Sequence, residues 1–405
     1  MSLPKLVKTG LIFGLLAFFF SLFFSIVVGE YIVKHLLPQN TYQMARMVGL
    51  HFFQAGENIP FTFQKNVKNF HHIGYTHEFD HLVSTNSWGT RGKEFSQTKD
   101  PKTMRILFLG DSMTFGWGVN DDQNYPYLVE TNLNDEAKQL KTDKKFESIN
   151  AGFTDGLTLD SYYVYLKENI ASFNPDLVVV DLFPYNDLSD MTEMRWVKTD
   201  AKGYPTQIIS DRQKVAVGYL ESRVKTNWMF EIPVLRNSHL AILIFNAMER
   251  GSPQTVDKIK QDLGVTSEKE AFTLNERLNC IYSFVPDMCH PDLLASAKKI
   301  DFLLLGLHDL VKENNKKFMV TIMASPDQAI KLASSGDREK TVSEAQPQKY
   351  YREFLAKNNI LYLDLLPVLS SGKPQEYFFG RDGHLNVNGH RLVAQTLASF
   401  ISKNY

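Results

Sequence analysis

The fold is decided by the stretch Met104-Arg105-Ile106-Leu107-Phe108-Leu109-Gly110-Asp111-Ser112-Met113-Thr114-Phe115-Gly116. An apolar run typical of a buried strand ends at Gly110, and a helix-like segment follows directly. Glycine permits a tight turn, and the amino end of a helix favours negative charge that develops beside it. A serine on such a turn becomes a nucleophile when a base and hydrogen-bond donors lie next to it. Ser112 is therefore the candidate nucleophile, although Asp and Ser are also ordinary helix caps.

Further apolar runs follow along the chain and alternate with amphipathic segments. The predicted strands are Arg105–Leu109, Phe146–Asn150, Leu177–Phe183, Phe318–Met323 and Ile360–Leu366. The predicted helices are Tyr125–Ala137, Leu159–Phe173, Pro291–Asn314, Tyr350–Asn358 and Asn388–Ser402. Near-continuous apolar strands separated by helices indicate a parallel sheet covered on both faces. We predict a doubly wound, flavodoxin-like three-layer α/β/α domain with about five parallel strands over residues 102–405.

One long segment, residues 189–290, interrupts this alternation and exceeds the length of an ordinary loop. Trp196, Trp228 and the helix-like run Leu240–Met248 indicate a partly helical insertion. It follows the carboxyl end of a strand, where α/β folds bind ligands, so a lid over the site and a packing element explain it equally well. Near its end lie Cys280 and Cys289, whose spacing allows a local disulfide outside the cytoplasm; two free thiols are the alternative.

The amino-terminal segment has the composition of a membrane span. Residues 10–29 contain no charged side chain. About 20 residues at ~1.5 Å each cross a hydrocarbon core of about 30 Å. Because Lys5 and Lys8 precede the span, we predict a cytoplasmic stretch over residues 1–9, a single transmembrane signal anchor, and an extracytoplasmic chain beyond it. A cleaved signal peptide is the alternative, but no small-residue cleavage motif follows.

Residues 30–101 are predicted to form a linker and a small β-rich segment, since Ile59 to Arg91 alternates as short strands do. Within it, His77-Glu78-Phe79-Asp80-His81 matches the zinc metallopeptidase motif. That chemistry needs a helix, which brings both histidines to one face. On a strand the two rings would lie ~13 Å apart, too far to share one zinc. We therefore predict no metal site, and a metallopeptidase is the weakest interpretation.

Polar residues suited to acyl chemistry follow several predicted strands, and the carboxyl ends of parallel strands meet at one edge of a sheet. Asp382 and His384 follow the last strand; in an extended loop they face the same side, so Asp382 can orient His384 toward the serine. Gly152 follows the second strand and Asn186 the third. Their N–H groups and the backbone N–H of Ser112 would supply three donors to an acyl oxyanion. Each residue alone is an ordinary turn residue, but their order favours a hydrolytic site.

With these residues in place, the chain resembles the SGNH/GDSL hydrolase family. The blocks that carry the resemblance are Gly110-Asp111-Ser112, Asn150-Ala151-Gly152, Pro184-Tyr185-Asn186-Asp187 and Asp382-Gly383-His384. The resemblance implies that Ser112 attacks an ester carbonyl, that His384 acts as general base and then acid, and that Ser112, Gly152 and Asn186 form the oxyanion hole. Residues 86–92 also resemble a segment that precedes this domain in membrane-anchored bacterial members.

Two features depart from the family pattern. Pro184 stands where the family has glycine, which would affect the backbone around Asn186. Asp382 precedes His384 by two residues rather than three, and this spacing resembles that of alginate-type O-acetyltransferases in the wider family.

We predict a membrane-anchored serine esterase of the periplasmic face of the inner membrane. It would hydrolyse O-acyl esters, O-acetyl esters among them, of an envelope glycan or lipid through an acyl-Ser112 intermediate, with no cofactor and no metal. A second interpretation is an O-acyltransferase that passes the acyl group to a sugar hydroxyl and is supplied by a membrane acyltransferase. A third is a catalytically silent carbohydrate-binding or assembly protein. The net charge of −1 and scattered basic residues argue against nucleic acid as a partner.

Overall fold

The computed structural model describes residues 5–37, 39, 41, 52–73, 78–154, 156–210, 232–251, 291–334 and 345–405. The chain divides into two compact units, which are described separately. The smaller unit comprises residues 1–48 and 220–269, and the larger comprises residues 49–219 and 270–405. His77, Trp228, Cys280 and Cys289 lie outside the described residues, and so does the proposed disulfide.

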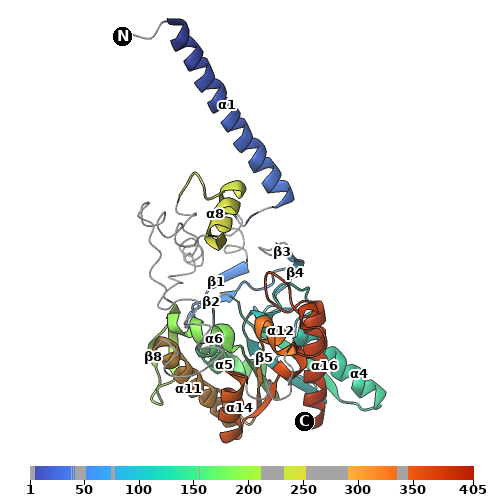
Figure 1. The fold of residues 1–405 in the computed structure, drawn as a ribbon. Coiled ribbons are helices and arrows are strands. Elements are labelled where there is room, and N and C mark those ends of the chain that lie inside the picture. Colours follow the sequence, from blue (N-terminus) through green and yellow to red (C-terminus); the bar gives the residue numbers. More distant parts are fainter. Residues whose placement is uncertain are drawn as a thin grey trace. The chain divides into compact units, whose positions relative to one another are not determined.

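The larger unit is built on a five-stranded parallel sheet (Figure 1). In spatial order its strands are β11 (Leu361–Asp364), β10 (Lys317–Ile322), β7 (Leu177–Leu182), β5 (Thr103–Gly110) and β6 (Lys145–Gly152). Numbered along the chain, this is the order 5-4-3-1-2, which is the flavodoxin-like arrangement read from its far edge. The predicted strands and the predicted α/β fold are therefore confirmed. The switch in strand order lies beside β5, so the stretch that ends in Ser112 reaches the edge where such folds bind ligands.

Helices cover both faces of this sheet (Figure 1). Helices α4 (Tyr125–Gln139) and α16 (Val387–Asn404) pack on each other, and α4 packs on β6. Helices α5 (Leu159–Phe173) and α11 (Pro291–Glu313) pack together, α11 also contacts β10, and α14 (Gln348–Lys357) contacts β11. Ile106 and Phe108 face the core cluster formed with α4 and α16, while the alternate residues Leu107 and Leu109 are equally buried. A strand buried on both sides explains the near-continuous apolar run in the sequence.

A small β-rich segment precedes the sheet, as predicted. It consists of two antiparallel hairpins, β1 (Phe53–Ala55) with β2 (Phe61–Phe63), and β3 (Phe70–Ile73) with β4 (Asp80–Val83). The ring of Phe63 lies 5.0 Å from the ring of Phe115, just beyond the Gly-Asp-Ser turn. Burial of these aromatic rings fixes the segment against the main domain.

The first part of the predicted insertion is a hairpin rather than a helix. After the 3₁₀ turn Met191–Glu193, strands β8 (Met194–Thr199) and β9 (Pro205–Ser210) pair antiparallel. Trp196 lies on β8, and its indole N–H donates to the buried Asp160 carboxylate at 2.9 Å. The larger unit also contains the short elements α12 (Pro326–Ala333), α15 (Leu366–Leu369) and the 3₁₀ turn Pro374–Glu376.

The smaller unit contains helix α1 (Lys5–Leu36) and helix α8 (His239–Gly251). Within α1, Ile12–Leu36 is long and apolar enough to cross a membrane, with a mean hydropathy of 2.5. The Glu30 carboxylate accepts hydrogen bonds from the His239 and Leu240 amides at 2.8 and 2.9 Å, and from the adjacent Ser238 hydroxyl at 2.7 Å. Glu30 therefore caps the amino end of α8, where unpaired N–H groups favour a negative charge.

Candidate active site

The Gly-Asp-Ser turn joins β5 to the short helix α3 (Ser112–Phe115). A Cβ atom at Gly110 would lie 2.0 Å from the Thr114 hydroxyl oxygen, so only glycine fits at the end of the strand. Asp111 caps the helix, because its carboxylate accepts a hydrogen bond from the Met113 amide at 2.9 Å. The backbone N–H of Ser112 is the first of α3 and has no partner within the helix. That N–H is thus available to an acyl oxygen beside the serine.

The structure brings the three predicted catalytic side chains together. Ser112 Oγ lies 2.7 Å from His384 Nε2, although the two residues are 272 positions apart. His384 Nδ1 is hydrogen-bonded to the Asp382 carboxylate. The Asp382 side chain is 8% exposed and the His384 ring 25%, so the ring can still meet a substrate. In a chain of contacts of this kind, an acid can fix the histidine tautomer and the histidine can take a proton from the serine.

The loop that carries the acid and the base was expected to be extended, but in the structure it is a tight turn. Gly383 adopts φ +85°, the left-handed region that favours glycine. Its amide donates to the Phe379 carbonyl at 3.0 Å, and the Phe379 amide donates to the His384 carbonyl at 2.8 Å. The turn at Gly383 lets Asp382 reach the imidazole across a two-residue spacing.

Gly152 ends strand β6 beside the nucleophile helix, but its amide already has an acceptor. The Gly152 N–H donates to Asn150 Oδ1 at 3.0 Å. A Cβ atom at Gly152 would lie 2.3 Å from the Phe115 amide nitrogen. Glycine is thus required by the close packing of α3 on β6, which differs from the predicted reason, open access to the amide. An acyl oxygen would have to replace Asn150 Oδ1 to use this donor.

Asn186 lies in helix α6 (Pro184–Asp190), which follows β7. Pro184 occupies the first turn of this helix, where no intrahelical N–H bond is lost, so its presence is compatible with the helix. Asn186 is next to the nucleophile turn: burial raises the pKa of Asp111, while the Met113 amide, His384 and the Asn186 side chain lower it. The Asn186 side chain therefore reaches the residue beside Ser112.

A second buried acid, Asp181 on β7, lies beneath the nucleophile helix. It accepts hydrogen bonds from the hydroxyl groups of Thr321 and Thr114, the latter at 3.4 Å. Burial, and then the charge of Asp111, raise the pKa of Asp181 to about 8. At neutral pH Asp181 is mostly protonated, which keeps a further negative charge away from Asp111.

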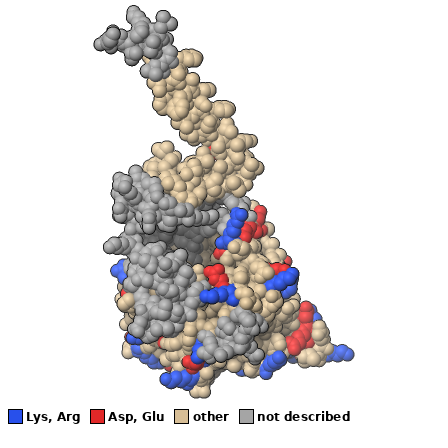
Figure 2. Space-filling view, in the orientation of Figure 1, with Lys and Arg blue, Asp and Glu red and all other residues tan. Residues whose placement is uncertain are grey.

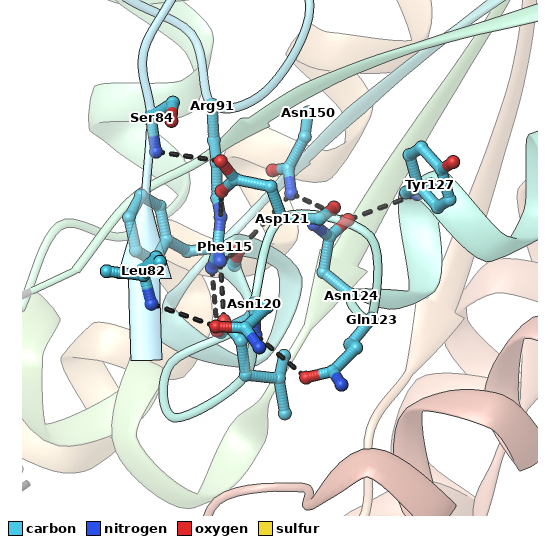
Figure 3. A network of polar contacts seen from close by, with 12 residues as sticks. Leu82, Ser84, Arg91, Phe115, Asn120, Asp121, Gln123, Asn124, Tyr127 and Asn150 are labelled. Carbon is cyan, nitrogen blue, oxygen red and sulfur yellow. Dashed lines mark hydrogen bonds and ion pairs between the residues drawn. The ribbon is translucent and has the colours of Figure 1, made fainter. Parts of the chain in front are cut away.

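The nucleophile helix is held from the β-rich side by Arg91, whose role the sequence analysis missed (Figure 3). The buried Arg91 guanidinium donates to the carbonyls of Phe115, Gly116 and Val119 at 2.8, 2.7 and 2.6 Å. It also pairs with the Asp121 carboxylate at 2.9 Å. Unpaired carbonyls at a helix carboxyl end carry partial negative charge, so a cation there fixes the end of α3.

Asn150 completes this network from strand β6. Its side-chain amide donates to the carbonyls of Thr114 and Phe115 at 3.1 and 3.2 Å, and its carbonyl oxygen accepts from Gly152. The Arg91 amide in turn donates to the Asn150 backbone carbonyl at 3.1 Å. The segment Asn150–Gly152 thus supports the helix that begins at Ser112.

The described residues of the metallopeptidase-like motif belong to a strand and the turn before it. His81 lies on β4, and its buried ring is 5.1 Å from His72 and 6.1 Å from Trp117. Burial, with the charges of His72 and Arg91, lowers the pKa of His81 to about 2. Glu78 does not face this ring pair, because its carboxylate binds the backbone of Arg381 and Asp382. His72 is buried as well.

Comparisons with known proteins add little to this geometry. No family model matches the chain, and no curated protein matches it. Similar solved structures include a GDSL-like lipase from Bacteroides thetaiotaomicron (13% identity, 77% of this chain and 93% of that chain, TM-score 0.35). A lipase/acylhydrolase from Enterococcus faecalis has 14% identity, 74% and 95% coverage and a TM-score of 0.35. An acetyl xylan esterase from Geobacillus stearothermophilus has 15% identity, with 73% of this chain and 92% of that chain covered and a TM-score of 0.34. At these scores the activity has to be argued from the site itself.

Proposed function

We propose that this chain is a serine esterase of the SGNH/GDSL type. The observation that carries the proposal is the contact between Ser112 Oγ and His384 Nε2 at 2.7 Å, with His384 Nδ1 on the Asp382 carboxylate. Ser112 Oγ attacks the ester carbonyl carbon and its proton passes to His384 Nε2. His384 then returns that proton to the departing alcohol. Water, deprotonated by His384, hydrolyses the acyl-Ser112 ester and frees the serine.

The negative charge that develops on the acyl oxygen is assigned to three donors. The Ser112 backbone N–H heads helix α3, whose amino end favours that charge. The Asn186 amide and the Gly152 N–H complete the set, the latter once Asn150 Oδ1 yields its place. One oxyanion donor typically contributes about 3–4 kcal/mol to the transition state.

Covalent labelling of the full-length chain in detergent with a fluorophosphonate tests this function. We expect labelling of the wild type on Ser112, and none in Ser112→Ala or His384→Ala. Ser371→Ala is the control, because that hydroxyl bonds only to the Val368 carbonyl of its own turn among the described residues. A wild type that is neither labelled nor active on an aryl acetate would overturn the proposal.

The substrate that we propose is an O-acyl or O-acetyl ester of an envelope glycan or lipid. The same serine, histidine and acid would serve a transferase in which a sugar hydroxyl replaces water, and the two-residue spacing of Asp382 and His384 resembles that class. Incubating acyl-loaded enzyme with and without an acetyl-free oligosaccharide separates the two. Release of free acid alone supports the esterase, whereas an acylated sugar detected by mass spectrometry supports the transferase and a membrane acyltransferase as its partner.

We propose that residues 1–9 are cytoplasmic, that residues 10–29 anchor the chain in the inner membrane, and that residues 30–101 and the 102–405 domain are periplasmic. The apolar helix Ile12–Leu36 supports an anchor. Glu30 supports an uncleaved one, because removal of α1 would leave the amino end of α8 without its cap. An alkaline phosphatase fusion after residue 40 should be active, and the mature protein should keep its amino-terminal sequence; an inactive fusion or a shortened chain would contradict this topology.

A further inference from the structure

Glu78 binds the backbone of the loop that carries the acid and the base. Its Oε1 and Oε2 accept hydrogen bonds from the Arg381 amide at 3.0 and 2.9 Å. Oε2 also accepts from the Asp382 amide at 2.8 Å. One carboxylate from the β-rich segment therefore holds two consecutive amides of this loop.

These two amides have no other hydrogen-bond acceptor among the described residues. The backbone-to-backbone bonds within the loop join Phe379 to Gly383 and His384, at its two ends, and the His384 amide also donates to Asp382 Oδ1 at 3.3 Å. Without Glu78, the Arg381 and Asp382 backbone would be fixed only from those ends. The position of the Asp382 carboxylate beside the imidazole thus depends on a residue 304 positions away.

A second contact from the same turn supports this arrangement. Phe79 is buried, and its ring lies 4.8 Å from the ring of Phe379, where the loop begins. Glu78 therefore binds the middle of the loop while its neighbour packs on the start. A carboxylate and an aromatic ring from adjacent residues restrict the loop at two points.

The strand that follows Glu78 is itself fixed to the nucleophile side of the site (Figure 3). The Leu82 amide donates to Asn120 Oδ1 and the Ser84 amide donates to Asp121 Oδ2, both at 2.9 Å. Asp121 also pairs with Arg91, which holds helix α3. Strand β4 thus links the support of the serine to the support of the histidine.

We infer that Glu78 is a positioning residue for the Asp382–His384 pair: it sets the loop so that His384 Nε2 meets Ser112 Oγ. This inference rests on the serine-esterase function proposed above. Displacement of a catalytic group by about 1 Å can cost about 100-fold in rate, so loss of the Glu78 bonds to these two amides should affect turnover more than substrate binding.

The test compares three variants of the full-length chain in detergent. We expect Glu78→Ala to lower kcat on an aryl acetate by about 10- to 100-fold with KM nearly unchanged, and to slow fluorophosphonate labelling of Ser112 equally. Glu78→Gln keeps one carbonyl oxygen for these amides and should recover most of the rate. Asp80→Ala is the matched control. It also removes an acid from this hairpin, but the Asp80 carboxylate pairs with His71 and not with the loop.

Two results would overturn the inference. One is wild-type kcat and labelling in Glu78→Ala. The other is a loss in Glu78→Ala that tracks a lowered melting temperature and is not recovered by Glu78→Gln, which is what a merely structural residue would give. A wild type that is not labelled at all would instead overturn the esterase function.

Discussion

The two halves of the candidate site are supported in different ways. On the nucleophile side, helix α3 is held by Arg91 and Asn150, which are 3% and 5% exposed. On the base side, the loop with His384 is held by Glu78, a half-buried carboxylate whose bonds to Arg381 are open to solvent. Desolvated charges are strongly destabilising when a partner is removed, whereas bonds near the surface can be replaced by water. The position of the serine is thus tied to domain stability, and that of the histidine is not.

The largest loss of activity should come from removing the His384 imidazole on the base side of the site. His384→Ala is expected to lower kcat/KM on an aryl acetate by about 10⁴-fold, since the proposed mechanism passes the serine proton to this ring and no other described side chain bonds to Ser112 Oγ. The melting temperature should hardly change, because the ring is partly exposed. His308→Ala on α11 is the matched control, because that ring is also 25% exposed and lies outside the site. Unfolding of His384→Ala would contradict the comparison.

The next effect should come from the nucleophile side and should appear as instability. Arg91→Ala removes the guanidinium donor from three buried carbonyls and the cation that pairs with Asp121. We expect the free energy of unfolding to fall by about 3–5 kcal/mol, measured by urea denaturation. If this variant does not fold, Arg91→Lys is the alternative. It keeps the positive charge without the planar guanidinium donors, and it should lose less stability. An unchanged urea midpoint in both variants would show that this network does not support the domain.

A pH-dependent effect on the free energy of unfolding should come from Asp181, the acid beneath the serine. Asp181 has a pKa of about 8 in the folded chain against 3.8 unfolded, so between these values only the folded chain keeps the proton. The contribution of Asp181 to the free energy of unfolding is therefore fully present below pH 3.8 and is lost as the pH rises through 8. Asp181→Asn should remove up to about 1.4 kcal/mol per pH unit of this dependence, seen in urea denaturation at pH 5 and pH 8. Equal pH dependence in wild type and variant would contradict the raised pKa.

Much of the fold could be predicted because its signals are local. The run Leu177–Leu182 is apolar apart from Asp181 and is buried on both faces, so composition alone predicts a central strand. The helices could be predicted from the periodic spacing of their apolar residues. The β8–β9 hairpin was not predicted, because its strands are half-exposed and their residues lack the continuous apolar character of the buried strands.

The site was predictable only where its residues form blocks. Ser112 and His384 stand in short motifs after strands, and the structure places them in contact. Arg91 and Glu78 gave no such signal, because each binds backbone groups far along the chain, and a backbone partner leaves no pattern in a single sequence. The turn at Gly383 was also missed, since two-residue spacing alone does not distinguish an extended loop from a left-handed glycine.

The bond between Glu78 and Arg381 spans 303 residues, and this bears on when the protein becomes active during its synthesis. The histidine is synthesised 272 residues after the serine, whereas Arg91 and Asn150, which support the serine, lie within about 40 residues of it. A nascent chain can therefore fold its first strands and display Ser112 without any base. The proposed ester cleavage therefore requires synthesis to have passed His384, so a chain that stops before this residue would hold the serine without its base.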